Sequence, residues 1–178
     1  MTDEDTVWYY TWKRLISSGI RVIGGEPPGG SSPLPRIEMK HPDKLSKGSR
    51  GSRKCDLYAV HGGTLFLIEA KDSHLKTQGD VDKLTDIIGD ADWSGALWEA
   101  MDERRLAARN GFPDRAAFVR ERGRLIAPIL AIPPEPGFEP PGGFLLIETD
   151  EEATTARVRG GRSSGDLLSV VTEFLRVR

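Results

Sequence analysis

The chain has 178 residues, of which 38% are hydrophobic and 29% are charged, and its formal net charge is −2. These proportions are typical of globular proteins, and the length predicts a single domain over residues 1–178. Such a charge excludes a protein coated in positive charge, so any contact with nucleic acid has to come from a local basic patch. Cys55 is the only cysteine, which excludes an internal disulfide and cysteine-rich metal centres.

The first ten residues, MTDEDTVWYY, are acidic and aromatic, whereas a secretory signal is basic and then apolar. No later segment approaches the ~18 consecutive apolar residues of a membrane-spanning helix. Together with the single cysteine, these features predict a cytoplasmic protein without a membrane span.

The N-terminal part of the chain predicts a helix, a short strand and a long loop. Apolar residues recur every three or four positions from Asp5 to Ser18, as on an amphipathic helix, and Gly19 supplies a C-terminal stop. Residues 20–23 predict a short strand. The following GGEPPGGSSPLP is a loop, because glycine and proline suppress regular structure.

A basic segment follows this loop. Between Arg36 and Lys54 there are seven lysines and arginines against two acidic residues. It is either a solvated loop or a surface that contacts phosphates, and we favour phosphate contact because the segment leads directly into Asp56. The residues expected to bind nucleic acid are Lys47, Arg50, Arg53 and Lys54.

The next two apolar segments, CDLYAV and TLFLIEA, predict a tight β-hairpin, because only His61-Gly62-Gly63-Thr64 separates their cores. With Gly62 and Gly63 at the centre of a two-residue turn, Tyr58 faces Leu67 and Asp56 faces Glu69. Side chains alternate between the two faces of a strand, so Lys71 emerges on the same face as Glu69.

The C-terminal half predicts helices and buried strands. Residues 81–110 have helical periodicity, ended by Gly111 and divided at Gly89 or Gly95. The apolar runs at 125–132 and 144–148 predict strands buried on both faces. An edge strand at 154–159 and a last helix capped by Ser163 or Ser164 complete an α/β domain.

The polar residues of the hairpin predict a metal site. Two facing carboxylates, Asp56 and Glu69, repel each other in apolar surroundings unless one is protonated or a cation lies between them. Mg²⁺ prefers such oxygen ligands, and a bound metal activates water for attack on phosphate. The alternative is a surface ion pair between Glu69 and Lys71, but ionised groups in a partly buried strand are costly without a partner.

These residues resemble the PD-(D/E)XK nuclease superfamily, in which an acidic residue precedes a strand carrying Glu-X-Lys; here they are Asp56 and Glu69-Ala70-Lys71. The family's core is a helix, a three-stranded meander, a helix and another strand, an order that residues 5–132 supply. The resemblance implies that Asp56 and Glu69 bind Mg²⁺ or Mn²⁺, that the Ala70 carbonyl assists, and that Lys71 positions the nucleophile.

Two further residues follow from this resemblance. Many family members add a glutamate on the first helix, and some carry a glutamine on the helix after the lysine; the candidates are Glu4 and Gln78. The literal Pro-Asp of the family's name occurs at Pro42-Asp43, which makes Asp43 the rival of Asp56.

The sequence therefore predicts a restriction-endonuclease-like mixed β-sheet flanked by helices, and a Mg²⁺-dependent nuclease that hydrolyses phosphodiester bonds. The family favours DNA over RNA as the substrate and suggests a homodimer. The alternative is a catalytically inactive protein of the same fold that binds nucleic acid or a partner protein. In an unrelated interaction domain, Asp56 and Glu69 would lie far apart.

Overall fold

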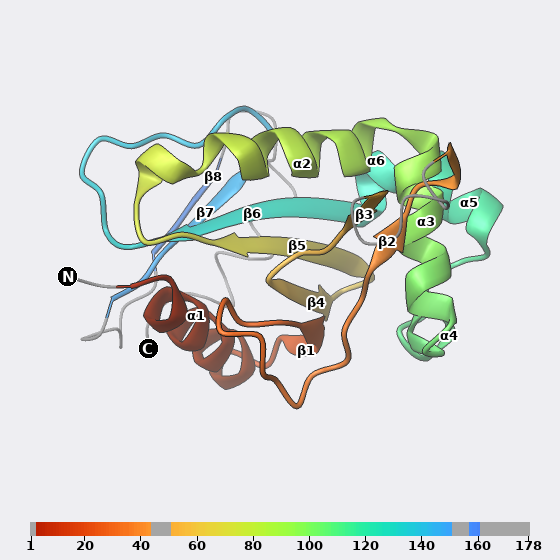
Figure 1. Cartoon of the computed structure of the whole chain (residues 1–178), viewed down its shortest axis with the longest axis horizontal. Coiled ribbons are helices and arrows are strands. Elements are labelled where there is room, and N and C mark those ends of the chain that lie inside the picture. Colours follow the sequence, from red (N-terminus) through yellow and green to blue (C-terminus); the bar gives the residue numbers. More distant parts are fainter. Residues whose placement is uncertain (1–2, 44–50, 151–156, 161–178) are drawn as a thin grey trace.

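The computed structural model describes residues 3–43, 51–150 and the backbone of 157–160. Its centre is a mixed sheet of six strands in the order β1-β4-β5-β6-β7-β8, with helices on both faces (Figure 1). A second, two-stranded sheet pairs β2 with β3. The strands are β1 Arg21–Gly25, β2 Met39–Lys40, β3 Ser52–Arg53, β4 Leu57–His61, β5 Thr64–Ala70, β6 Ile126–Ile132, β7 Leu145–Glu148 and β8 Arg157–Gly160.

The helices of the described residues include three long ones and several single turns. They are α1 Glu4–Ser17, the 3-10 turn His74–Lys76, α2 Gln78–Gly89, α3 Ala91–Asp102, α4 Leu106–Arg109, α5 Arg115–Arg120 and α6 Arg122–Leu125. In Figure 1, α1 covers one face of the sheet and α2 runs across the other. No helix in this part of the chain has both the length and the apolarity to cross a membrane.

The first helix matches its prediction to within one residue at each end. Asp3 caps α1 by accepting a hydrogen bond from Thr6 N at 2.8 Å, and Gly19 leaves the helix with φ +78°. The buried face of α1, with Val7 and Leu15, packs on Phe66 and the other residues of β5 that point to this side.

The predicted hairpin and its register are confirmed. Gly62 and Gly63 have φ values of +57° and +78°, the left-handed pair that a tight two-residue turn requires. Tyr58 pairs with Leu67, and the last pair of the ladder is Leu57 with Ile68, one step short of Asp56 and Glu69. Asp56 therefore lies just before β4 and not within it.

The sheet combines antiparallel and parallel pairs. β1, β4 and β5 form an antiparallel meander, β5 pairs with β6 in parallel, β6 pairs with β7 in parallel, and β8 is antiparallel to β7. Both predicted apolar runs are confirmed as fully buried strands, β6 and β7. The predicted edge strand is confirmed over 157–159 and ends at Gly160, whereas the predicted last helix lies outside the described residues.

The helical segment at 81–110 is divided next to Gly89, where Asp90 has extended backbone and caps α3 by accepting hydrogen bonds from Asp92 N and Trp93 N. Gly95 lies inside α3, so the alternative break there is wrong. The side chain of Arg115 passes over Gly95, where a Cβ atom would lie 2.4 Å from it.

Candidate active site

Asp56, Glu69 and Lys71 meet where β4 begins and β5 ends, between the first turns of α1 and α2 (Figure 1). Asp56 Oδ2 accepts a hydrogen bond from Ala70 N at 2.8 Å, which fastens the carboxylate to the end of β5. Its backbone carbonyl accepts from Trp8 Nε1 at 2.9 Å and from Glu26 N at 3.0 Å. Three segments of the chain therefore fix the position of Asp56.

Glu69 is an acidic side chain buried inside the protein. It is 1% exposed, and burial, followed by the negative charge of Asp56, raises its pKa well above the usual range of a glutamate. Lys83 opposes this shift, because its Nζ lies 2.8 Å from Glu69 Oε2. The second oxygen, Oε1, has no hydrogen-bond partner among the described residues.

Burial raises the pKa of Asp56 as well, although the hydrogen bond from Ala70 and the charges of Lys71 and Lys83 oppose the rise. The two predicted metal ligands thus share one poorly solvated environment. A cation is the partner that such a pair of carboxylates favours.

Lys71 follows β5 and turns toward α1 and α2. Its Nζ lies 2.6 Å from Glu4 Oε1 and 3.6 Å from Asp80 Oδ2. Burial lowers the pKa of Lys71, but the hydrogen bond to Glu4 and the charges of Asp56 and Asp80 outweigh it, so the pKa is raised. Lys71 is therefore an ammonium group at neutral pH.

The predicted glutamate on the first helix is brought to the cluster, whereas the predicted glutamine is not. Glu4 is the first residue of α1 and contacts Lys71. Gln78 is exposed and donates a hydrogen bond to Asp82 Oδ1 at 2.8 Å on the outer face of α2. The rival Asp43 is exposed beside His41, whose Nδ1 lies 3.9 Å from its carboxylate, and Asp56 is the acidic residue that joins Glu69.

Sequence reasoning missed two residues of α2, Asp80 and Lys83. Asp80 is 8% exposed, and Lys83 Nζ lies 3.1 Å from its Oδ1 while also contacting Glu69. The signal was present in the sequence: Asp80 stands one and two helical turns before Leu84 and Ile87, on the buried face of the helix. A carboxylate at such a position requires a charged partner inside the protein.

The donor set fits a hard divalent cation. Four carboxylates, from Glu4, Asp56, Glu69 and Asp80, gather around the ammonium groups of Lys71 and Lys83. Glu69 Oε1 and Asp80 Oδ2 are buried and lack hydrogen bonds. Asp56, Glu69 and Asp80 would hold Mg²⁺ or Mn²⁺ through oxygen atoms.

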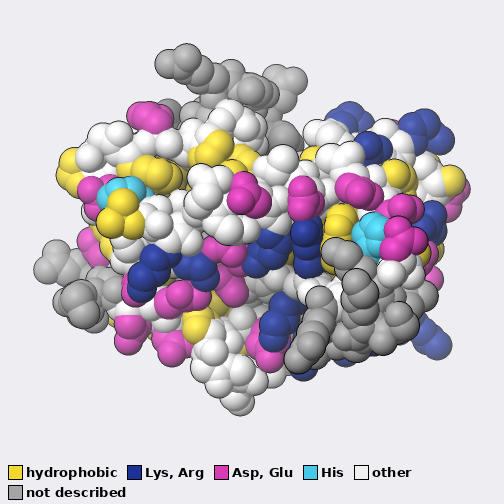
Figure 2. Space-filling model, turned by 45° about the horizontal axis from the view of Figure 1, so that its top comes forward, with side chains coloured by type: hydrophobic (Ala, Val, Ile, Leu, Met, Phe, Trp, Pro, Cys, Tyr) yellow, Lys and Arg dark blue, Asp and Glu magenta, His cyan; other side chains and the backbone are white. Residues whose placement is uncertain are grey.

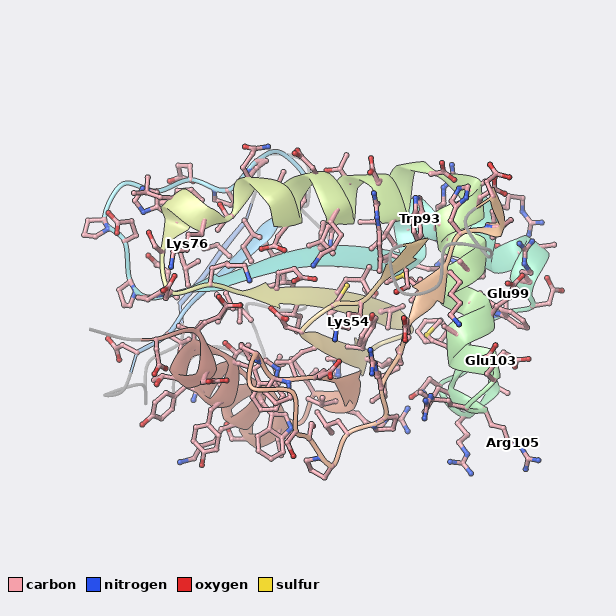
Figure 3. The ribbon with its side chains drawn as sticks, viewed as in Figure 1. Lys54, Lys76, Trp93, Glu99, Glu103 and Arg105 are labelled. Atoms are coloured by element: carbon pink, nitrogen blue, oxygen red, sulfur yellow. The ribbon has the colours of Figure 1, made fainter. Side chains whose placement is uncertain are left out.

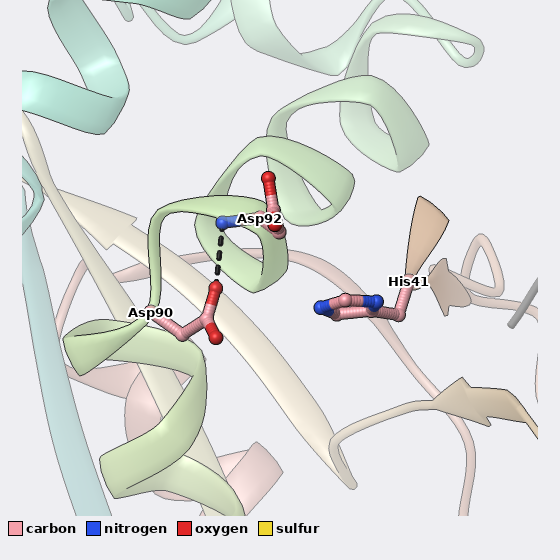
Figure 4. A group of neighbouring side chains, drawn as sticks. All are labelled: His41, Asp90 and Asp92. Atoms are coloured by element: carbon pink, nitrogen blue, oxygen red, sulfur yellow. Dashed lines mark hydrogen bonds between the residues drawn. The ribbon is translucent and has the colours of Figure 1, made fainter. Parts of the chain in front are cut away.

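The ligand atoms of Asp56, Glu69 and Asp80 do not all lie within 4.8 Å of one another. Within the described part of the chain, a different group meets this distance: the ligand atoms of His41, Asp90 and Asp92 all lie within 4.8 Å of one another (Figure 4). Asp90 and Asp92 are exposed, and Asp90 already serves as the cap of α3. His41 Nδ1 accepts from Asp43 N at 3.2 Å, so its lone pair there is occupied.

The predicted nucleic-acid contacts are described in part. Lys47 and Arg50 lie outside the described residues. Arg53 stacks on Trp93 with its guanidinium carbon 4.3 Å from the ring centre, and pairs with Asp86 at 2.7 Å. Lys54, on the segment before β4 in Figure 3, is 47% exposed and lies 2.5 Å from Glu26. Their role in nucleic-acid binding stays a prediction.

The buried thiol of Cys55 is the last group beside Glu69. Burial and then the Glu69 charge raise its pKa well above the usual range of a cysteine, so it is a neutral thiol.

Comparisons with protein-family models, with curated proteins and with solved structures found no match.

Proposed function

We propose that this protein is a metal-dependent nuclease that hydrolyses phosphodiester bonds in DNA. The observation that carries the proposal is the convergence of Asp56, Glu69 and Lys71 at the end of β5, with two carboxylates in a poorly solvated place and an ammonium beside them. Mg²⁺ or Mn²⁺ bound there would supply an activated water and offset the charge that develops on the phosphate.

The order of elements supports a restriction-endonuclease-like fold for this domain. That family has a helix, a three-stranded meander, a helix and another strand; here α1 precedes the meander β1-β4-β5, and α2 and α3 lead to β6. β6 is parallel to β5 and brings its own C-terminal end beside Lys71, whose N–H donates to Ala131 O at 2.9 Å. The acidic residues of the family motif would then lie where β5 ends, with the Glu69 side chain buried.

The role of Lys71 follows from its charge. An ammonium has no lone pair with which to remove a proton, so Lys71 acts as a hydrogen-bond donor that orients water or a phosphate oxygen. Glu4 accepts one of its three hydrogens and thereby sets the direction of the others. Asp56 and Glu69 supply the oxygen ligands, and the hydrogen bond from Ala70 N keeps one Asp56 oxygen facing β5.

The choice of DNA and of a homodimer rests on the family resemblance. On the face that α2 crosses, acidic and basic side chains are interleaved, and no wide basic surface is visible (Figure 2). A substrate strand would therefore be attracted by a few local positive groups and by the metal, with a correspondingly weak dependence on salt.

One observation favours a second candidate, an inactive protein of the same fold that binds nucleic acid or a partner protein. Lys83 pairs with Glu69 and Lys71 pairs with Glu4, so part of the buried negative charge is neutralised without any metal. In that case the cluster is a structural ion-pair network, and metal contributes nothing to binding.

Incubation with DNA and RNA separates the two functions. The nuclease is expected to degrade DNA with Mg²⁺ or Mn²⁺, to stop with a chelator, and to lose activity in Glu69→Gln and Lys71→Ala. Asp82→Asn, an exposed position on α2, is the matched control. All variants are first checked for folding by circular dichroism. Cleavage by Lys71→Ala at the wild-type rate would refute the role of Lys71, and the absence of any metal-dependent cleavage would favour the inactive protein.

A further inference from the structure

The ammonium of Lys83 occupies the position of a cation between two carboxylates from different elements. Its Nζ lies 2.8 Å from Glu69 Oε2 on β5 and 3.1 Å from Asp80 Oδ1 on α2. Both acidic residues are buried, with exposed fractions of 1% and 8%. The Lys83–Glu69 pair therefore links α2 to β5 at this point.

A single ammonium leaves this bridge incomplete. Glu69 Oε1 and Asp80 Oδ2 are buried without a hydrogen bond, and Asp80 Oδ2 lies 3.6 Å from Lys71 Nζ. Lys83 is the ammonium that contacts both carboxylates, and Lys71 lies farther away, beyond hydrogen-bond distance of Asp80. A divalent cation with several oxygen ligands would satisfy both the charge and the unused oxygens.

The Lys83 side chain is able to move its ammonium away from Glu69 and Asp80. Its side chain is 23% exposed, whereas that of Glu69 is 1% exposed. A lysine carries its charge on a long flexible stem, and rotation of that stem moves the ammonium into water. The carboxylates, fixed on a strand and a helix, would remain in place.

We propose that Asp80 is the third protein ligand of the metal site, and that Lys83 is a displaceable internal cation that occupies the site until metal binds. This inference rests on the proposed function, because it assigns two residues to the same metal site. It adds that the metal ion takes the place of the Lys83 ammonium between β5 and α2 when it binds. Apparent metal affinity is then set by the competition between Lys83 and the ion.

Two measurements on the intact chain test this exchange. The first is calorimetric titration with Mn²⁺ alone at pH 8. Asp80→Asn is expected to bind about tenfold more weakly than wild type or worse, because an oxygen ligand loses its charge. Asp82→Asn, on the exposed side of the same helix, is expected to bind as wild type does. Equal affinity of Asp80→Asn and wild type would overturn the assignment of Asp80.

The second measurement needs no variant. Lysine acetylation, quantified by mass spectrometry, is compared in the wild-type protein with and without Mn²⁺. Displacement predicts that Lys83 becomes several-fold more reactive when Mn²⁺ is present, while Lys76, already 60% exposed, stays constant. Unchanged or lower reactivity of Lys83 would overturn the exchange, even where Asp80→Asn fails to fold.

The outcomes distinguish this inference from the proposed nuclease. If wild type binds Mn²⁺, and Asp56→Asn weakens binding but Asp80→Asn does not, only the further inference fails. If both exchange measurements succeed and DNA stays intact, the metal site stands and the nuclease fails. If wild type binds no Mn²⁺, both fail.

Discussion

Lys71 Nζ lies 2.6 Å from Glu4 Oε1, although 67 positions separate the two residues in sequence. The contact joins the first residue of α1 to the first residue after β5, and it fixes the direction in which the ammonium points. Both side chains are partly buried, at 18% and 29% exposure, so the pair is only partly screened by water.

Glu4→Gln tests this positioning role. The variant keeps the size of the side chain but weakens the hold on Lys71, so we expect kcat to fall by about 10- to 100-fold while KM changes less. The measurement is steady-state cleavage of a DNA substrate in Mg²⁺. The control is Asp5→Asn, next to it on α1. A rise in KM with unchanged kcat would contradict the positioning role.

The raised pKa of Glu69 predicts how stability depends on pH in the metal-free protein. Its folded-state pKa lies above the unfolded value near 4.5, so the folded state holds this proton more tightly. Protonated Glu69 therefore contributes its full stabilisation of the folded state below pH 4.5, and this contribution is lost as the pH rises through the folded-state pKa of Glu69.

Glu69→Gln removes this titration, so its stability relative to wild type should increase as the pH rises above 4.5 toward the folded-state pKa of Glu69. Urea unfolding in a chelator at several pH values measures the difference. Asp82→Asn should show no such slope. A difference between Glu69→Gln and wild type that stays constant over this range would show that Glu69 has an ordinary pKa.

Arg53 and Lys54 are expected to respond differently to substitution. Arg53→Gln loses the Trp93 stack and the Asp86 pair, so it should lower the free energy of unfolding by about 1 kcal/mol. Lys54→Gln should leave stability nearly unchanged and reduce the salt slope of DNA binding by about 1. Urea unfolding measures the stability of the two variants, and DNA titrations at several salt concentrations measure the salt slope. A stability loss in Lys54→Gln but not in Arg53→Gln would contradict the roles given to these two residues.

Gly25 allows the close approach of β1 to Asp56. Its φ is +151°, and a Cβ atom there would lie 2.5 Å from the Asp56 carbonyl oxygen. Gly25→Ala should therefore destabilise the protein by about 1–3 kcal/mol and displace Asp56, lowering Mn²⁺ affinity.

Gly30→Ala is the control for Gly25→Ala, since Gly30 has φ +79° with open space around it and measures backbone strain alone. Thermal unfolding and Mn²⁺ titration report both effects. Equal losses in the two variants would show that the contact with Asp56 has no special cost.

The hairpin could be predicted because local residues decide it. Gly62 and Gly63 select the turn, and the turn then sets which residues of the two strands face each other. The same logic brought Asp56 to the end of β5, although the ladder stops one pair earlier. Asp56 Oδ2 instead accepts from Ala70 N, a contact that alternation of strand faces does not predict.

Asp80 and Lys83 could not be placed in this way, because their partners depend on how α2 packs across the sheet. A helix face shows which residues are buried but not which strand they meet. The pairing of Met39 and Lys40 with Ser52 and Arg53 was missed for a similar reason, since two-residue strands carry no periodic pattern.

The indole of Trp8 gives the site an optical reporter. Its N–H is bonded to the carbonyl of Asp56, and its ring lies 5.7 Å from that of Trp12. Trp93 and Trp98 belong to α3, so replacing both with phenylalanine would leave a tryptophan pair beside the candidate metal ligands. Emission from that pair would follow the loading of the site in unlabelled protein, on the timescale of a stopped-flow mixer.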